Sequence, residues 1–427
     1  MSLIHENSCA CVGSQLDLFT LPGTQTSQEK NTYVPHYPIS SLADGPLEFD
    51  IKASSMYTDL GDTRLYLRCK VVKQDGTTVP ATEEVSVCNM FMHALIQRLD
   101  VYVGDTLITQ SGGFYPWKSS IETLLNFGSD AKTSQLANIM YYKDTTGGDG
   151  FQNRKKLTKG SKTFELFAPL HVDFFFQEKY LISNVPVRMK ITRSSPDFYL
   201  VTSGALVCKV EITEAVLWVR RVQVSPSVEL AHSRALLSGK NAVYPIRRGE
   251  VEVMSVPPNQ TTVCRDNLFM SRLPKKLIIT MVSNDIFNGL KTSSPFVYHH
   301  FGLSSIELSI DGENVCGTPM PLDFAGQKYM RAYQGIFHAF NKSYTDAGND
   351  ITYQDFKSGY SLFCFDLTAD GCGNSSNHFE LTRQGNIRFK MNFDTPLTST
   401  INIIVYGEFE SVLEITNSRE VLLDYRN

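Results

Sequence analysis

Apolar and polar residues follow two successive patterns between Leu99 and Gly128. The first pattern alternates on both sides of the turn residues Gly104-Asp105 and predicts a two-stranded hairpin. After Pro116, four apolar residues recur at helical spacings and share one face of a predicted helix: Trp117, Ile121, Leu124 and Leu125. Proline in the first turn and glycine after the end are typical of such a helix. The stretch therefore predicts a hairpin followed by a short amphipathic helix.

This succession of hairpin and helix occurs a second time in the chain. Residues 306–316 (IELSIDGENVC) predict another hairpin with its turn at Asp311-Gly312, and four residues then repeat the helical spacing: Tyr329, Tyr333, Ile336 and Phe337. Three strand patterns also recur in the same order, 65–69 with 277–281, 187–191 with 387–391, and 214–217 with 410–413. The offsets drift from 212 to 200 and 196 residues, as expected for two copies that differ in loop length.

Further alternating segments complete each copy. Residues 46–53 (PLEFDIKA) and 64–71 alternate apolar and polar positions, and strands are predicted at 163–170, 185–191 and 206–219. Each copy then holds about eight strands and a short helix within a long connection. Sandwiches with this strand count and long crossovers are jelly rolls. We therefore predict a mainly β fold of two tandem eight-stranded jelly rolls, with short helices in the long connections.

These patterns divide the chain into four parts. Residues 1–45 are polar and predict an extended N-terminal arm, and residues 46–223 form the first jelly roll. Residues 224–241 hold a connecting helix that opens at Ser225-Pro226 and ends at Gly239. The second jelly roll with a C-terminal tail spans 242–427. Around TTGGDG (145–150) and the basic run 154–156 we predict an irregular, solvated loop, with contact to an acidic partner surface or a genome as the alternative.

Composition narrows the function classes. With 427 residues, 42% of them hydrophobic, the chain can bury two cores, and its net charge of −4 argues against coating nucleic acid by charge alone. We find neither a signal peptide nor an apolar run near the roughly 20 residues that span a bilayer. Nine scattered cysteines indicate a reducing compartment without a disulfide framework. Cys9 and Cys11 could bind a metal, but partner ligands at zinc spacing are missing nearby.

Motifs that carry catalysis are missing from the sequence. We find no HExxH, no GxSxG and no dinucleotide-binding fingerprint, and His299-His300 lacks a third ligand at a recognisable distance. The nine histidines are dispersed, which argues against a cupin-like metalloenzyme. We therefore assign no catalytic, cofactor-binding or metal-binding residue and expect a protein that is not an enzyme.

Several longer runs resemble one protein family. They are LDLFTLPGTQTS (16–27), YPWKSSIETLLNFG (115–128) with Ala131-Lys132 and 142–145, FAPLHVDFFFQEKYLISNVPV (167–187), VSPSVELAHSRAL (224–236), YPIRRGE (244–250), 266–269, AGNDI (347–351) and LTRQGNIRF (381–389). Together they resemble the major capsid proteins of Maverick/Polinton virus-like transposons and related adintoviruses over nearly the whole chain.

This resemblance implies a double jelly-roll capsid subunit. Such subunits form homotrimers with a pseudo-hexameric outline, which tile an icosahedral shell around a double-stranded DNA genome that they contact without sequence specificity. The expected partners are neighbouring capsomers, a penton protein, and the processing protease and packaging ATPase of the same element. The expected location is the virion, after synthesis in the cytosol and assembly in the nucleus or cytoplasm.

Six residues are candidates for contacts between subunits: Tyr115, Trp117, Tyr329, Tyr333, Arg247 and Arg248. Aromatic side chains are typical anchors of permanent interfaces, and the two arginines could pair with acidic groups between the jelly rolls. The alternatives are that the helix faces belong to the core of their own sandwich and that the arginines are solvated. At the level of function, the alternatives are a carbohydrate- or receptor-binding double sandwich in a spike or minor capsid component, and a domesticated relic that no longer assembles.

Overall fold

The computed structural model describes residues 5–43, 45–144, 149–204, 206–374, 378–380 and 383–424. Its strands up to the midpoint are β1 (Gln28–His36), β2 (Leu47–Ile51), β3 (Tyr57–Lys73), β4 (Val85–Val87), β5 (Ile96–Val103), β6 (Thr106–Gln110), β7 (Phe164–Ala168), β8 (Val187–Arg193), β9 (Leu200–Thr202) and β10 (Cys208–Val224). The later strands are β11 (Ala242–Val256), β12 (Thr262–Arg265), β13 (Lys276–Ser283), β14 (Leu303–Ile310), β15 (Glu313–Asn314), β16 (Met320–Pro321), β17 (Leu362–Asp366), β18 (Ile387–Phe393), β19 (Ile401–Ile415) and β20 (Val421–Leu423).

The helices lie in the connections between these strands. They are α1 (Phe91–Ala94), α2 (Tyr115–Asn126), α3 (Ser129–Thr133), α4 (Asp149–Thr158), α5 (Pro196–Tyr199), α6 (Pro226–Leu237), α7 (Asn284–Asn288), α8 (Met330–His338) and α9 (Tyr353–Lys357). Short 3-10 turns include η1 (Ser14–Leu16) and η4 (Asp173–Phe176). As predicted, α6 connects the two parts of the chain, and α2 and α8 follow the hairpins β5–β6 and β14–β15.

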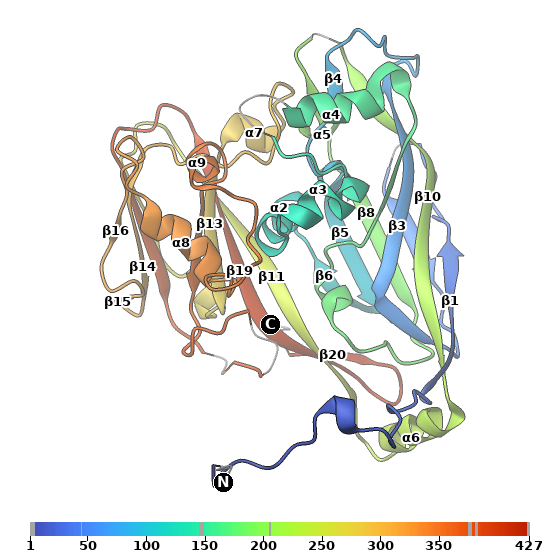
Figure 1. Cartoon of the computed structure of the whole chain (residues 1–427). Coiled ribbons are helices and arrows are strands. Elements are labelled where there is room, and N and C mark those ends of the chain that lie inside the picture. Colours follow the sequence, from blue (N-terminus) through green and yellow to red (C-terminus); the bar gives the residue numbers. More distant parts are fainter. Residues whose placement is uncertain are drawn as a thin grey trace.

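The two parts of the chain have the same sheet topology. In the first, one sheet has the order β1-β10-β3-β7 and the other the order β2-β8-β5-β6. In the second, the orders are β11-β19-β13-β17 and β12-β18-β14-β15. Leaving out the short strands β4, β9, β16 and β20, each part has eight strands, which can be numbered from one to eight along the chain. In both parts one sheet then has the order 1-8-3-6 and the other the order 2-7-4-5, and neighbouring strands are antiparallel. This order is that of a jelly roll, so the structure confirms two tandem jelly rolls (Figure 1).

The predicted alternation holds in β3 of the first jelly roll and is replaced by continuous burial in its counterpart β13 of the second. In β3, Leu65, Leu67 and Cys69 are buried while the residues between them keep exposed surface. In β13, every position from Lys276 to Val282 is buried. In the sheet that holds β13, η4 and α2 of the first jelly roll pack against β11 and α8 packs against β17, so helices cover this sheet in addition to its partner sheet.

The structure corrects the predicted extent of the N-terminal arm. Residues 28–36 form β1, which pairs with β10 from Gln28↔Val224 to His36↔Leu217 and is the first strand of the first jelly roll. Because β1 is an edge strand without a fully buried residue, its sequence lacks the apolar alternation by which the other strands were found. Residues 5–27 precede it as an exposed segment with one 3-10 turn.

The structure also corrects the loop predicted around the basic run. Residues 149–158 form α4, and Arg154 within it is only 1% exposed. The remainder of the TTGGDG motif, residues 145–148, lies outside the described residues. The sequence predicts a solvated loop here because the residues of α4 form no apolar face that would indicate a helix.

Candidate assembly surfaces

Helix α2 lies between the two jelly rolls, at the centre of Figure 1. Trp117 in its first turn stacks on Phe287 of α7, with ring centroids 5.4 Å apart and the planes at 4°. Phe198 from the first jelly roll and Phe296 from the second meet the same indole edge-on at 5.7 and 5.8 Å. Trp117 is 2% exposed, so it is core between the two jelly rolls of one chain and offers no surface to a second copy.

Tyr115 is held by two histidines of the first jelly roll. Its hydroxyl lies 3.1 Å from His93 Nδ1 and accepts a hydrogen bond of 3.1 Å from the backbone N–H of His171. The imidazoles of His93 and His171 meet edge to face at 4.7 Å. Burial raises the pKa of Tyr115 and lowers that of His93 well below its usual value. Tyr115 is thus a buried structural residue, and the core alternative holds for it as for Trp117.

Charged residues of α2 form a buried network that reaches the second jelly roll. Lys118 forms an ion pair with Asp173, and Glu122 binds His171 and accepts a hydrogen bond of 3.0 Å from the hydroxyl of Tyr406 in β19. Burial works against both charges, but the neighbouring carboxylates raise the pKa of Lys118, and Lys118 together with His171 lowers the pKa of Glu122. Both groups are therefore charged at neutral pH. Glu122 reaches the second jelly roll through Tyr406, and Asp173, the partner of Lys118, accepts a hydrogen bond of 3.3 Å from the backbone N–H of Gly249 in β11.

Helix α8, the counterpart of α2, covers its own jelly roll. Tyr329 at its start is 1% exposed, stacks on Tyr353 at 4.2 Å, and donates a hydrogen bond of 3.1 Å to the carbonyl oxygen of Tyr353. Tyr333 donates to the carbonyl oxygen of Ile351 at 2.9 Å and keeps part of its surface exposed. Tyr329 is therefore core, whereas the contact of Tyr333 with another subunit stays a prediction.

The two predicted arginines follow each other in β11 and have different surroundings. Arg248 pairs with Glu250 on the same strand, and its guanidinium lies 5.6 Å from the centroid of the Phe409 ring. Arg247 donates to the carbonyl oxygen of Asn374 at 3.4 Å and faces a cavity between the jelly rolls. Both keep part of their surface, so their role in contacts between subunits stays a prediction.

Three lysines that the sequence analysis missed cross between the jelly rolls. Lys342, after α8, donates hydrogen bonds of 3.0 and 2.7 Å to the carbonyl oxygens of Leu125 and Asn126 at the end of α2. Lys132 donates to the carbonyl oxygens of Leu124 and Asn349 at 2.9 and 2.5 Å.

The third lysine, Lys143, forms an ion pair of 2.8 Å with Asp355. Lys132 and Lys342, unlike Lys143, donate to carbonyl oxygens at the C-terminal end of α2, where the partial negative charge of the helix favours a cation. The spacing of the three lysines in the sequence matches no local motif, so only the tertiary fold reveals their contacts.

A cavity of about 680 Å³ opens between the jelly rolls. Glu122 and His171 line it from the first jelly roll, and Arg247, Lys276 and Tyr406 line it from the second. Lys276 pairs with Glu408 at 2.8 Å and lies 4.4 Å from the centroid of the Phe340 ring. The walls combine aromatic rings with charges of both signs, a lining that suits a polar ligand better than an apolar one.

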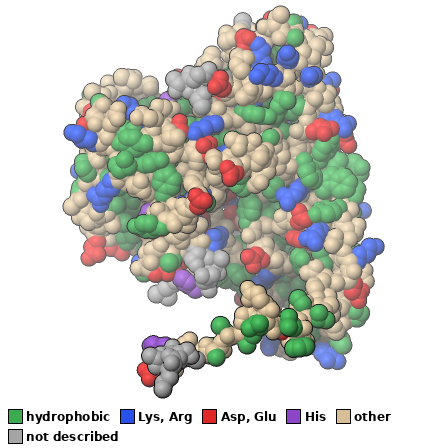
Figure 2. All heavy atoms as spheres, in the orientation of Figure 1, with side chains coloured by type: hydrophobic (Ala, Val, Ile, Leu, Met, Phe, Trp, Pro, Cys, Tyr) green, Lys and Arg blue, Asp and Glu red, His purple; other side chains and the backbone are tan. Residues whose placement is uncertain are grey.

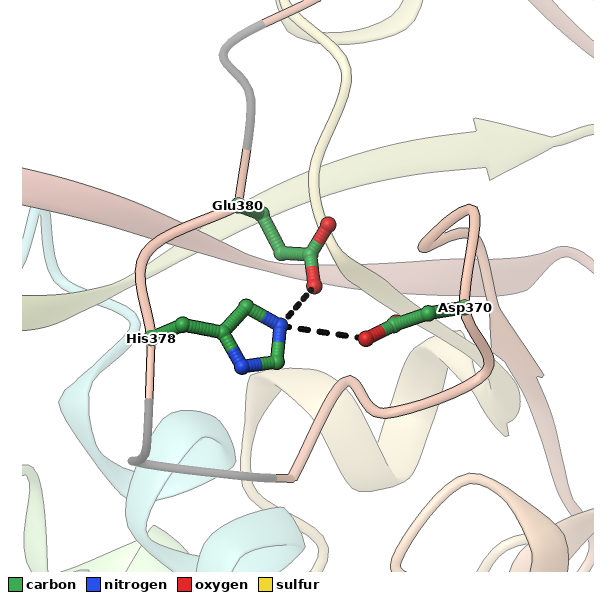
Figure 3. A group of neighbouring side chains, drawn as sticks. All are labelled: Asp370, His378 and Glu380. Atoms are coloured by element: carbon green, nitrogen blue, oxygen red, sulfur yellow. Dashed lines mark hydrogen bonds and ion pairs between the residues drawn. The ribbon is translucent and has the colours of Figure 1, made fainter.

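A loop at the edge of this cavity brings together three potential metal ligands. Asp370, His378 and Glu380 lie between β17 and β18, and their side chains point toward one another (Figure 3). His378 Nε2 is 3.0 Å from Asp370 Oδ2 and 3.1 Å from Glu380 Oε1. The dispersed histidines of the sequence gave no sign of this group, because a carboxylate eight residues away in a loop matches no local metal-binding motif.

The segment of residues 5–27 exposes large apolar side chains between Val12 and Leu21. The exposed fractions of Leu18, Phe19 and Leu21 are 74, 95 and 93%. Figure 2 shows hydrophobic side chains along this arm where it leaves the body of the molecule. Exposed apolar side chains this close together in the chain make the arm a candidate surface for contact with another molecule.

The fold and these surfaces define a class of protein: a double jelly roll whose two sandwiches are locked together within one chain. Solved structures confirm this fold. The chain is similar to the Sputnik virophage structure (12% identity, TM-score 0.59, 100% of this chain and 95% of the other) and to the mavirus major capsid protein (10% identity, TM-score 0.57, 99% and 97%). It is also similar to the Faustovirus major capsid protein, with 9% identity and a TM-score of 0.55 over 92% of both chains.

Among curated sequences, the chain is similar to an uncharacterized protein of Caenorhabditis elegans. The two are 25% identical over 423 residues, which cover 95% of this chain and 99% of the relative. No model of a protein family matches the chain. Within the described residues, none of the helices combines the length and apolar character that crossing a membrane requires.

Proposed function

We propose that this chain is the major capsid subunit of a virus or virus-like element and that its role is structural rather than catalytic. The observation that carries the proposal is the repeated strand order of the two jelly rolls. Three such chains related by a threefold axis present six similar sandwiches, which fill a hexagonal position in a closed lattice. The contacts between the two sandwiches of one chain hold them in a fixed orientation, as a rigid capsid subunit requires.

The similar solved structures support this role. Two of them are the major capsid proteins of mavirus and of Faustovirus, and a third is the structure of the Sputnik virophage. Each similarity extends over nearly the whole of both chains, so the pair of jelly rolls is shared as one unit. A virion location follows from the same proposal.

The finer expectations belong to this proposal as well. They are the Maverick/Polinton lineage, a homotrimeric capsomer, an icosahedral shell around double-stranded DNA, and a penton protein, processing protease and packaging ATPase as partners. The nematode relative, which spans almost the same length, favours an element carried in animal genomes. The alternative within this proposal is that this copy is a domesticated relic of such an element that no longer assembles.

The mass of the protein in solution tests the proposal. Three chains of 47.9 kDa give a particle of about 144 kDa, and obligate interfaces in it should bury more than roughly 2,000 Å² in total. Light scattering after size exclusion is expected to give this trimer mass, and negative-stain microscopy with the penton partner is expected to give closed shells. A stable monomer at micromolar concentration contradicts a capsomer role, and a trimer that never forms shells indicates the relic.

The cavity between the jelly rolls favours a second candidate, a carbohydrate- or receptor-binding double sandwich. Its lining includes the aromatic residues Phe127, Phe176 and Tyr406 and the amides of Asn126 and Asn374, which are groups that bind sugars. This candidate predicts a monomer that binds glycans. The mass measurement therefore separates it from the capsid subunit.

A further inference from the structure

The loop from β17 to β18 holds an imidazole between two carboxylates. Asp370 lies early in the loop, and His378 and Glu380 lie toward its end. The three side chains converge from opposite sides of the loop on one point, as Figure 3 shows. Their nearest ligand atoms all lie within 4.8 Å of one another.

The distances within this group match those around a bound metal ion. The two carboxylate oxygens approach the same nitrogen, His378 Nε2, at 3.0 and 3.1 Å. An imidazole nitrogen carries one hydrogen at most, so it can donate one well-directed hydrogen bond, not two. Ligands bound at about 2.0–2.2 Å to one cation lie about 3–3.5 Å from each other, and His378 Nε2 is about this far from each of the two carboxylate oxygens.

The surrounding residues hold the carboxylate of Asp370 and the backbone of Glu380 in place. The other oxygen of Asp370 accepts a hydrogen bond of 2.9 Å from the backbone N–H of Cys372. The backbone N–H of Glu380 donates to Glu410 in β19 at 2.6 Å, which fixes this end of the loop to the sheet. Partners of this kind orient metal ligands in known sites.

We propose that Asp370, His378 and Glu380 bind a divalent transition metal ion of the zinc class and thereby fasten the β17–β18 loop at the edge of the cavity. The imidazole selects zinc-class ions over Mg²⁺ and Ca²⁺, which prefer ligand sets of oxygen alone. Three protein ligands at an exposed site leave coordination positions for water. The site joins loop positions ten residues apart and holds His378 and Phe379 against the cavity that they line. The inference does not depend on the capsid role.

Zinc binding by the full-length chain tests the site. Because Cys9 and Cys11 are exposed and can bind zinc themselves, the measurement uses a full-length Cys9→Ser/Cys11→Ser protein. Isothermal titration of the chelator-treated protein with zinc chloride is expected to give one site per chain. His378→Gln is expected to weaken that site at least about tenfold, and His338→Gln, which changes a histidine outside the group, is expected to leave it unchanged.

A second measurement reports the loop itself. Phe379 is 49% exposed and offers a chymotrypsin site beside His378. Zinc is expected to slow cleavage after Phe379 in the parent protein and to have no effect on that cleavage in His378→Gln, with the fragments identified by mass spectrometry. Equal zinc affinity of parent and His378→Gln would overturn the proposal. So would the absence of a stoichiometric site, or binding of Mg²⁺ as tight as that of zinc; the three residues are then an ion-pair cluster only.

Discussion

The ring of Phe287 in the second jelly roll stacks on the indole of Trp117 in the first, with 5.4 Å between the ring centroids. The two residues are 170 positions apart in the chain, and each belongs to a short helix in a long connection. This contact makes α2 a shared core element of both sandwiches. The helix that the sequence pattern predicts as amphipathic is therefore buried on more than its apolar face, and its polar residues are buried as well.

Trp117→Ala is expected to lower the free energy of unfolding by about 3–5 kcal/mol, because it removes a large buried side chain with aromatic partners from both jelly rolls. Denaturant unfolding followed by circular dichroism measures the change. Trp117→Phe, which keeps one ring in the stack, is the control and should lose distinctly less. The double variant Trp117→Ala/Tyr329→Ala should unfold more easily with its oligomeric state unchanged, and dissociation into equally stable monomers would show instead that the helices form the contact between subunits.

Lys342→Met is expected to cost about 1–2 kcal/mol of stability. The ammonium group donates to the last carbonyl oxygens of α2, at Leu125 and Asn126, and methionine keeps the aliphatic stem while removing these hydrogen bonds and the favourable charge at the helix end. Thermal unfolding by calorimetry measures the loss. Lys328→Met is the matched control, since the side chain of Lys328 is 80% exposed, and it should change stability by less than about 0.5 kcal/mol. Equal effects of the two substitutions would refute the capping role.

Lys132 predicts a pH dependence of stability. Burial lowers its pKa to about 7, although Asp350 opposes the shift. In the unfolded chain the pKa returns to its usual value near 10.5, so between these two values the unfolded state binds more protons than the folded state. The free energy of unfolding therefore rises with pH through this range, by about 2 kcal/mol for this group between pH 7 and 9.

Subtracting the same measurement on Lys132→Met isolates this contribution from other titrating groups. Methionine cannot titrate, so its unfolding free energy should rise less between pH 7 and 9 than that of the parent. It also leaves the carbonyl oxygens of Leu124 and Asn349 without their donor, which lowers stability at both pH values alike and cancels in the comparison. Identical pH slopes for parent and variant would show that Lys132 keeps an ordinary pKa.

The sequence predicts the elements that have a local signal and misses features that depend on contacts between distant positions of the chain. The hairpin at Gly104-Asp105, the helix with Trp117 and the repeated strands follow from periodicity, and the structure confirms them. Edge strand β1 is missed because solvent covers one of its faces and a polar sequence suffices there. The burial of Trp117 and the lysine contacts need tertiary information, because the partners lie 170 or more residues away in the chain. Trp117 meets Phe287, and the lysines Lys342 and Lys132 meet Asn126 and Asn349, respectively.

Arg154 also depends on tertiary contacts, in this case within its own jelly roll, and Arg154→Ala is expected to destabilise the first jelly roll by about 3–5 kcal/mol. Its guanidinium donates to the carbonyl oxygens of Val87 and Tyr142 at 2.9 and 2.7 Å and pairs with Asp144 at 2.7 Å, so the substitution leaves these groups unsatisfied. Urea unfolding measures the loss. Lys156→Ala in the same basic run changes an exposed residue and should be nearly neutral. If both substitutions are neutral, the run is a solvated surface as its sequence suggests.

The exposed arm of residues 5–27 is expected to act in assembly and not in folding. Leu18, Phe19 and Leu21 make no contribution to the core, so replacing all three by serine should leave the melting temperature of the subunit within about 1 °C of the parent value. The same variant should form shells poorly, because the apolar surface that another copy would cover is lost. Differential scanning calorimetry and negative-stain particle counts measure the two effects.

Thr24→Ala/Thr26→Ala, a change of polar residues in the same arm, is the control and should assemble like the parent. A serine variant that assembles normally would contradict a role of the arm in contacts between subunits, and one that melts far lower would show that the arm packs on its own chain.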